Sequence, residues 1–250
     1  MYALKIRIKF SKTGIMKFIG HLDVMRYFQK VNRRAGVDIA YSGGFSPHQI
    51  MSFASPLGLG LTSEGEYLDI EMNGTEDSRT MRDRMNHEMV EGMEILSYRR
   101  LPDTAKPAMS IVAAADYMVS SKEGYEEILW DGWKAFFASF CSQESILIWK
   151  KTKKCEKQVD IRPMIYEWRV EASGIFLRLA AGSADNLKPE LLLEALFQYA
   201  GREFCPHAFS IHRLEIYADT GTEKEHSFIP LEEMGEEILI PVPRTEEDKP

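Results

Sequence analysis

The stretch GGFSPHQIMSFASPLGLGLTSEGEYLDIEM, residues 43–72, runs from a glycine- and proline-rich segment directly into an alternating strand. Its adjacent glycines, Gly43 and Gly44, can adopt positive φ angles and let a ligand approach the backbone closely. Pro47 and Pro56 hold the chain extended on either side. Connections of this length with special backbone chemistry are more often functional loops than spacers. We therefore predict a long glycine-rich loop suited to an anion or a nucleotide.

The same stretch supports two other interpretations. Glycine and proline are ordinary turn residues, so the segment would also suit tight turns around a buried Phe45 and Phe53. His48, Glu64 and Glu66 would suit an enzyme, with a histidine acid/base and carboxylates that act as a base or bind a metal. Glu64 and Glu66 are two residues apart and would share one face of a strand, although a solvated acidic turn has the same pattern.

The segments on both sides of the loop predict an α+β domain. Residues 3–10 alternate apolar and cationic side chains, which indicates a strand with one buried face. Val24, Phe28 and Val31 lie on one stripe of a helix predicted at 21–35. The remaining patterns predict strands at 37–41, 66–72 and 93–99 and a helix at 78–90. The order β-α-β-loop-β-α-β is typical of the split βαβ, or ferredoxin-like, fold.

The second half of the chain repeats this order. Its patterns predict strands at 110–120, 146–150, 167–172, 175–181 and 209–217 and helices at 126–140 and 189–200. We therefore predict two tandem ferredoxin-like domains, residues 1–103 and 108–218, with a linker at Leu101–Pro107. The acidic segment 219–250 has no helical period, and we expect a loose tail. Residues 228–243 within it would alternatively add a strand to a partner's sheet edge.

Charge is distributed unevenly along the chain. The formal net charge is −7, but residues 1–50 hold nine Lys and Arg against two Asp and Glu, which gives +7. A basic lobe of this kind is the electrostatic footprint of a polyanion partner such as nucleic acid. The cations of the predicted helix lie opposite its apolar stripe: Arg26, Lys30, Arg33 and Arg34. A routine charged helix surface with cations near its C-terminus is the alternative explanation.

A second charged segment, residues 150–165, occupies the position in the second half that corresponds to the glycine-rich loop. Lys153, Lys154 and Arg162 are its candidate phosphate ligands, because guanidinium and ammonium groups bind phosphate oxygens. Exposed lysines without any ligand would have the same pattern.

Several classes of protein are not indicated. No run of about 18 apolar residues occurs and the first ten residues show no signal-peptide pattern, so we expect a cytoplasmic protein without a membrane span. The three cysteines, Cys141, Cys155 and Cys205, are far apart and predict no disulfide, zinc or iron–sulfur site. The GxxxxGK[ST] and GxGxxG motifs are missing, and we predict neither a cofactor nor a metal.

Four motifs can be singled out: FIGHLDVMRYFQKVNRRAG, GGFSPHQIMSFASPLGLGLTSEGEYLDIE, VDIRPMI and GSADNLKPELLLEAL. Together they resemble the radical-SAM-linked protein family over about residues 2–217, and the first two are the most specific. Members of that family occur alone or fused to cobalamin-binding radical SAM proteins, and they are catalogued as a domain of unknown function. The resemblance therefore implies a radical SAM protein as partner and no particular reaction. This chain departs from the family pattern at Gln49, where proline is usual, and in its acidic tail.

Three functional hypotheses follow. The first is an accessory RNA-binding protein without activity of its own that presents substrate to a separate radical SAM modification enzyme. In it the helix cations neutralise phosphates, the backbone of Gly43 and Gly44 with His48 contacts an anion or a base, and Tyr41 or Phe45 stacks. The second is an enzyme acting on a nucleotide-like or phosphorylated small molecule. The third is a protein–protein adaptor whose glycine-rich loop docks on the radical SAM partner.

Overall fold

The computed structural model describes residues 4–151, 156–183, 185–222 and 225–243. The chain divides into two compact units, of which the first consists of Met1–Val112 and Glu215–Pro250 and the second of Ala113–Leu214. Both units combine strands with a few helices, so the predicted α+β class is confirmed. None of the described helices has the length and apolar character needed to cross a bilayer.

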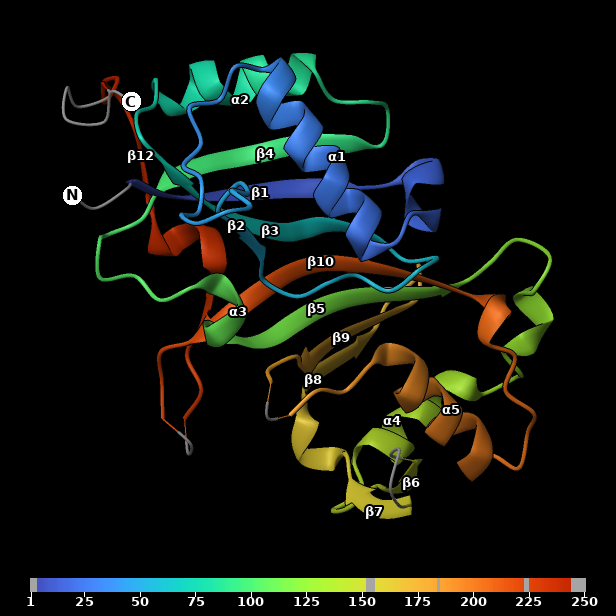
Figure 1. Cartoon of the computed structure of the whole chain (residues 1–250). Helices are drawn as coiled ribbons and strands as arrows, with labels where there is room; N and C mark the ends of the chain where they lie inside the picture. Colours follow the sequence, from blue (N-terminus) through green and yellow to red (C-terminus); the bar gives the residue numbers. More distant parts are fainter. Residues whose placement is uncertain (1–3, 152–155, 184, 223–224, 244–250) are drawn as a thin grey trace. The chain divides into compact units, whose positions relative to one another are not determined.

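An antiparallel sheet forms the centre of the first unit (Figure 1). Its strands are β1 (Leu4–Lys12), β2 (Met51–Phe53), β3 (Thr62–Met72) and β4 (Met93–Arg100), in the order β4-β1-β3-β2. The central residue Ile8 lies opposite Leu68 of β3 and opposite Tyr98 of β4. All three side chains are buried, which confirms the face expected from alternation in β1 and β3.

Two helices, α1 (His21–Arg34) and α2 (Ser78–His87), cover one face of this sheet (Figure 1). The stripe of α1 that includes Phe28 packs into the core with Met81 and Met85 of α2, and all three side chains are fully buried. Gly36 follows α1 with φ +61°, a conformation that ends the helix at low cost because glycine has no Cβ.

The strand expected at residues 37–41 is not formed. These residues make only isolated bridges, Ile39 with Met72 and Tyr41 with Gln49. The Ala40 amide still donates to the Glu71 carbonyl at 2.7 Å, so the chain follows the end of β3 for a short distance. Regular pairing with β3 begins only at β2, because the intervening residues leave the sheet to form the glycine-rich loop.

The second unit contains an antiparallel sheet of β5 (Val112–Ser121), β9 (Ile175–Ala180) and β8 (Ile165–Val170), in that order. Its main helices are α4 (Trp133–Cys141) and α5 (Pro189–Tyr199). β6 (Leu147–Lys151) and β7 (Glu156–Asp160) form a separate two-stranded ribbon. β10 (Phe209–Asp219) contributes its first residues to the second unit and its last to the first.

Three boundaries of the second unit differ from expectation. A short helix, α3 (Ala108–Ile111), precedes β5 and belongs to the first unit. The helix expected from residue 126 begins at Trp133, because Gly132 has φ +79° and separates it from a 3-10 turn at Glu126–Ile128. Residues 156–160 form β7 where a charged loop was expected, and Cys155 lies outside the described residues.

The expectation of a loose acidic tail is wrong for its described residues 225–243. β11 (Phe228–Pro230) pairs with the end of β10, a 3-10 turn follows at Leu231–Met234, and β12 (Glu236–Glu237) pairs with β4. Leu231 and Ile238 are buried in the first unit. The segment is ordered because these apolar side chains enter the core.

Candidate nucleic-acid interface

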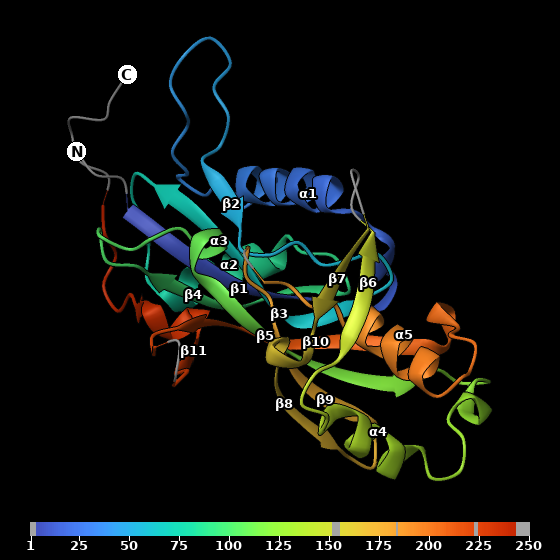
Figure 2. The same ribbon diagram turned by 90° about the horizontal axis from the view of Figure 1, so that it is seen from below.

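A projecting loop, defined here as residues 42–48, leaves the first unit between α1 and β2. Figure 2 shows it extending well beyond the neighbouring helix and strands. Cross-loop hydrogen bonds close its two ends: the Ser42 amide donates to the His48 carbonyl at 2.9 Å, and the His48 amide donates to Ser42 Oγ at 3.2 Å. His48 Nδ1 lies 2.8 Å from the same hydroxyl. The loop is therefore a closed hairpin with a defined apex.

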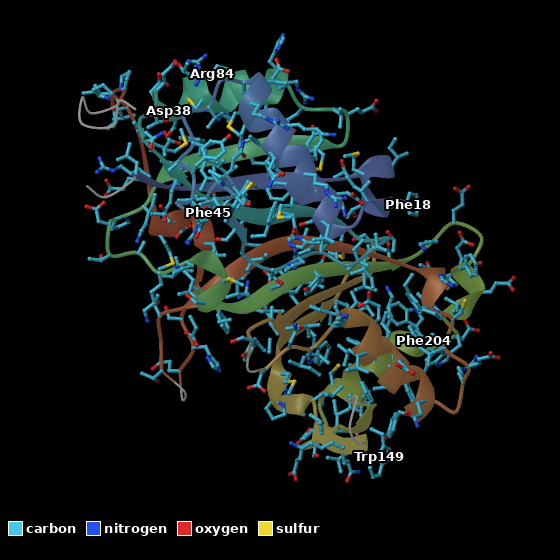
Figure 3. All side chains as sticks on the ribbon, viewed as in Figure 1. Phe18, Asp38, Phe45, Arg84, Trp149 and Phe204 are labelled. Carbon is cyan, nitrogen blue, oxygen red and sulfur yellow. The ribbon has the colours of Figure 1, made fainter. Side chains whose placement is uncertain are left out.

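The apex of the projecting loop is open to solvent. Gly43, Gly44, Phe45 and His48 are all exposed, and the Phe45 side chain is completely so (Figure 3). Gly44 has φ +98° with no atom near the position of a Cβ, so the conformation alone favours glycine there. The alternative of tight turns around a buried Phe45 is wrong, because this ring is completely exposed.

Phe53, by contrast, belongs to the core side of the first unit. Its ring makes edge-to-face contacts with Phe10, Phe28 and His21, at centroid distances of 6.0, 5.8 and 5.1 Å. His21 at the start of α1 is thus a half-buried partner of an aromatic cluster. The two phenylalanines of the glycine-rich stretch have opposite roles, one packed and one presented to solvent.

The base of the projecting loop is attached to α1 by a buried amide pair. Asn32 Nδ2 donates to Gln49 Oε1 at 3.0 Å, and both residues are buried. Gln49 Nε2 donates to the Gln29 carbonyl at 3.3 Å and to the Tyr41 hydroxyl at 3.4 Å. Gln49 therefore couples both strands of the loop base to the helix.

The outward side of α1 carries cations. Arg26, Lys30 and Arg33 recur at intervals of four and three residues, all three are exposed, and they form what we call the basic stripe. Arg26 pairs loosely with Asp23 at 3.3 Å, with both side chains mostly in solvent. Arg33 Nε lies 3.4 Å from the carbonyl of Gln29, the residue that also accepts from Gln49. The basic stripe thus lies on the helix to which the base of the projecting loop is hydrogen-bonded.

Arg34, a predicted phosphate ligand, has a structural partner. Its guanidinium donates to Glu88 Oε2 at 3.1 Å and to the Glu88 carbonyl at 2.7 Å. Glu88 is the residue that ends α2, so this contact joins the two helices. The basic stripe therefore contains three cations of α1 and omits Arg34.

Much of the positive charge of residues 1–50 is used inside the first unit. Five of the nine cations bond to groups outside α1: Lys5, Arg7, Lys9, Lys12 and Arg34. Arg7 is buried and binds both carboxylate oxygens of Asp69, at 2.8 and 3.0 Å. The charge count thus overstates the cations that a ligand meets, because sequence position does not reveal which of them are paired.

Lys9 is the centre of a half-buried charge cluster that includes the C-terminal segment. Lys9 Nζ donates to Glu215 at 2.6 Å and to Glu232 at 2.7 Å, while the Tyr67 hydroxyl donates to Glu215 at 2.7 Å. Burial opposes the charge on Lys9, but the two carboxylates outweigh it and raise its pKa. Burial and the Glu215 carboxylate raise the pKa of Tyr67 far above its usual range. These groups stabilise the fold.

The residues proposed for catalysis lie in different surroundings. His48 is in the projecting loop, whereas Glu66 is buried in β3, near Lys12 and His21 around a cavity of about 20 Å³. Glu64 is exposed, because a bulge sets Glu64 and Gly65 opposite a single residue of β1 and breaks the alternation. The expectation that Glu64 and Glu66 share one face is therefore wrong.

The charged segment of the second unit is organised by Asp160. Asp160 Oδ1 accepts from the backbone amides of Arg162 at 3.0 Å and Ile146 at 2.8 Å, and these hydrogen bonds lower its pKa. Arg162 donates to the Ile165 carbonyl at 3.1 Å and helps to form this corner. The other predicted phosphate ligands there, Lys153 and Lys154, lie outside the described residues.

The described residues show no metal-binding site and no reactive thiol. Within them, no group of three or more His, Cys, Asp or Glu side chains is placed to hold a metal ion. Cys141 is buried, and burial raises the pKa of its thiol to about 12, as for a packing residue. His207 lies in a 3-10 turn and His212 in β10.

Sequence patterns did not reveal two features of the first unit that bear on its function. The first is the Asn32–Gln49 pair. An asparagine next to the apolar stripe of a helix indicates a buried amide that needs a hydrogen-bond partner, and Asn32 is in that position. A second is the apolar group Ile15, Phe18, Leu22 and Leu59, whose side chains are 61–80% exposed (Phe18 is labelled in Figure 3). The Gly60 amide donates to the Lys17 carbonyl at 2.8 Å, which brings the 57–61 loop beside this turn.

Comparison with known proteins places the chain in one family. No curated protein matches the sequence. A family described as an uncharacterized protein conserved in bacteria, DUF2344, matches residues 5–189, which include β1, α1, the projecting loop and most of the second unit. Because the match covers well over half of the chain, the protein belongs to the DUF2344 family of uncharacterized proteins conserved in bacteria.

Proposed function

We propose that the first unit binds RNA through the basic stripe of α1 and the projecting loop. The observation that carries the proposal is the completely exposed ring of Phe45 on a closed loop whose base is hydrogen-bonded to α1. Because the loop and the helix are joined at Gln29 and Asn32, an aromatic platform and a row of cations are presented together. Such pairs of features bind single-stranded nucleic acid.

The basic stripe supplies the contact with phosphates. Arg26, Lys30 and Arg33 extend over about two turns of α1, or roughly 10 Å, so they can meet successive phosphates of one strand. Cations bound to phosphates release counterions, so this part of the affinity depends on salt rather than on base sequence. The exposed Gly43 and Gly44 leave the backbone near the apex accessible to a phosphate or a base.

Phe45 supplies the contact with bases. An exposed aromatic ring gains little from water and much from stacking, and base–aromatic stacking contributes about 1–3 kcal/mol per base. Tyr41 at the loop base is half exposed but accepts a hydrogen bond from Gln49, so we assign it to support of the loop. His48 holds the hairpin closed through Ser42 and adds a polar edge near the apex.

The proposal includes two split βαβ domains in tandem. The order β4-β1-β3-β2 with two helices on one face supports a split βαβ domain in the first unit, and β5, β9 and β8 with α4 and α5 support a second one. Sheets of this type carry RNA-binding surfaces in other proteins. By its resemblance to radical-SAM-linked proteins, we propose that the chain presents RNA to such an enzyme and catalyses no reaction itself.

The proposal is tested by charge reversal on α1. We compare RNA affinity over a range of salt concentrations for the double variant Lys30→Glu, Arg33→Glu and for the matched variant Arg79→Glu, Arg82→Glu on α2, where Arg79 is exposed and Arg82 partly exposed. For single strands, loss of two phosphate contacts lowers the slope of log affinity against log salt by about 1.4. Equal slopes for the two variants would show that the stripe does not bind RNA.

A protein–protein adaptor is the second candidate, and the exposed apolar group at Ile15, Phe18, Leu22 and Leu59 favours it. Contiguous exposed apolar side chains mark interaction surfaces more often than isolated ones do. In this hypothesis the group docks on the radical SAM partner, and Phe18→Ser with Leu22→Ser abolishes copurification of the two proteins while RNA affinity is unchanged. Copurification that survives both changes removes this surface from consideration.

A further inference from the structure

The second unit contains a pocket between α4, β6 and α5, with a volume of about 450 Å³. Figure 1 shows the ribbon of β6 and β7 beside these two helices. Three aromatic rings and three polar side chains are prominent in its lining: Phe140, Trp149, Tyr199, Gln143, Ser145 and Gln198. We call it the amide–aromatic pocket. Neither Arg162 nor the projecting loop contributes to its described lining.

The aromatic rings of this pocket are exposed to an unusual degree. Trp149 is 65% exposed and Tyr199 is 56% exposed, and Leu147 beside them is 58% exposed (Trp149 is labelled in Figure 3). Large rings gain free energy from leaving water, so two of them at the mouth of a concave surface mark a place where something binds. Pockets of this volume accommodate small ligands or single residues of a larger one.

The Tyr199 and Trp149 rings of the pocket are carried by regular elements of the fold before any ligand binds. The Tyr199 ring lies 5.5 Å from the rings of both Phe136 and Phe140, so it is supported from α4. Trp149 is in the middle of β6, directly opposite Gln158 of β7. Rings fixed on regular elements lose little freedom on binding, which favours affinity.

The polar chemistry of the pocket narrows the class of ligand. None of its described lining residues is charged. Gln143 Nε2 donates to the Phe140 carbonyl at 2.9 Å, while Ser145 contributes a hydrogen bond to Asp160. The amide of Gln198 makes no side-chain hydrogen bond with the described residues. Primary amides offer both a donor and an acceptor, so the matching ligand is planar, uncharged and has donors and acceptors along one edge.

We propose that the amide–aromatic pocket binds an unpaired nucleobase of an RNA strand, stacked on Tyr199 or Trp149 and hydrogen-bonded by Gln198. This inference rests on the proposed RNA-binding function and adds a base subsite in the second unit. Bases are planar, uncharged and edged with donors and acceptors, whereas an aliphatic side chain of a docking protein would leave the amide unmatched.

The test uses nucleoside monophosphates as probes of the whole protein. We measure binding of adenosine and uridine 5′-monophosphates by equilibrium dialysis to the wild type, Tyr199→Ala and Gln198→Leu. The matched controls are Tyr125→Ala and Asn186→Leu, which change exposed side chains of the second unit outside the pocket. We expect affinity at least tenfold weaker for the two pocket variants and unchanged for the controls. We expect all variants to fold, because the altered side chains are largely at the surface. Thermal melting verifies this.

The outcomes separate this inference from the proposed function. Saturable nucleotide binding that is lost in the Tyr199 and Gln198 variants supports the pocket even if reversal of the basic stripe leaves RNA affinity unchanged. RNA binding that depends on the stripe but not on Tyr199 or Gln198 would overturn the pocket inference alone. If the pocket binds a hydrophobic peptide and no nucleotide, the inference is also overturned and the pocket is identified as a protein-docking site.

Discussion

Gln49 accepts a hydrogen bond from Asn32 of α1 at 3.0 Å, with both side chains buried at the base of the projecting loop. The side-chain oxygen of Asn32, Oδ1, has no hydrogen-bond partner among the described residues, so the bond to Gln49 is the main polar contact of that side chain. A buried amide needs its partner, because an unmade hydrogen bond costs more than a made one contributes. Together with the Gln49 hydrogen bonds to Gln29 and Tyr41, this contact attaches the loop base to the helix.

Gln49→Ala is expected to destabilise the first unit by about 1–3 kcal/mol, because it leaves the Asn32 amide buried and unpaired. The change also loosens the loop, so the amides of Ser42 and His48, which are protected by cross-loop bonds, exchange faster with solvent. Urea unfolding and hydrogen exchange measure the two effects. The control Gln158→Ala, at an exposed position, should have neither effect. Unchanged exchange at Ser42 and His48 would contradict the anchoring role.

Phe45→Ala is expected to weaken binding of single-stranded RNA by about 1–3 kcal/mol without altering stability, because the ring is outside the core and the proposed function assigns it a stacking role. Phe45→Trp should retain the affinity and Phe45→Leu should lose it, which separates stacking from general apolar contact. Fluorescence anisotropy with a labelled oligonucleotide measures all three. Equal affinity for the leucine and tryptophan variants would be inconsistent with stacking.

Asp69→Asn is expected to destabilise the first unit by about 3–5 kcal/mol, because it leaves the buried guanidinium of Arg7 without a counter-charge. Asp69 also accepts from the Ala108 amide at 2.7 Å, so the loss extends to the start of α3. Asp83→Asn, in an exposed pair, is the control. Replacement of both partners, Arg7→Met with Asp69→Leu, should recover much of the loss. A double variant no more stable than Asp69→Asn would argue against the unpaired charge as the cause.

Glu232→Gln is expected to reduce stability by about 1–2 kcal/mol near neutral pH. This loss is smaller than for a fully buried ion pair, because the pair of Glu232 with Lys9 is partly exposed to solvent. Although burial alone would raise it, hydrogen bonding and charge attraction from Lys9 lower the pKa of Glu232 below its ordinary 4.5. Its contribution is therefore complete above pH 4.5 and disappears as pH falls. The raised pKa of Lys9 means that the contribution of Lys9 is complete below pH 10.5 and is lost above it.

Chemical unfolding of the wild type and Glu232→Gln at several pH values measures this dependence. The difference between the two proteins should be constant from about pH 5 to pH 10 and should shrink on the acid side. A difference that persists unchanged at pH 2 would show that the carboxylate charge does not contribute. Glu233→Gln, one residue away and exposed, controls for the general charge of the segment.

Secondary structure was predictable wherever one residue pattern dominated. The alternation in β1 and the apolar stripe of α1 decide their own faces, because a buried face requires apolar side chains at a fixed period. The tail was mispredicted because its many carboxylates dominate its composition. They conceal the apolar residues Leu231 and Ile238, which enter the core. Local composition cannot show that a distant surface is available to bury two side chains.

The sequence by itself determined the α+β class, the positions of the main strands and helices, and the glycine-rich loop, because periodicity and backbone chemistry are local properties. Only the tertiary structure decided which cations are available to a ligand. Arg7 and Arg34 have the same charge as Arg26 and Arg33, yet the first two meet carboxylates from Asp69 and Glu88, far away in the chain. Their pairing depends on which residues the fold brings within hydrogen-bond distance, and that is a property of the packed chain rather than of any segment.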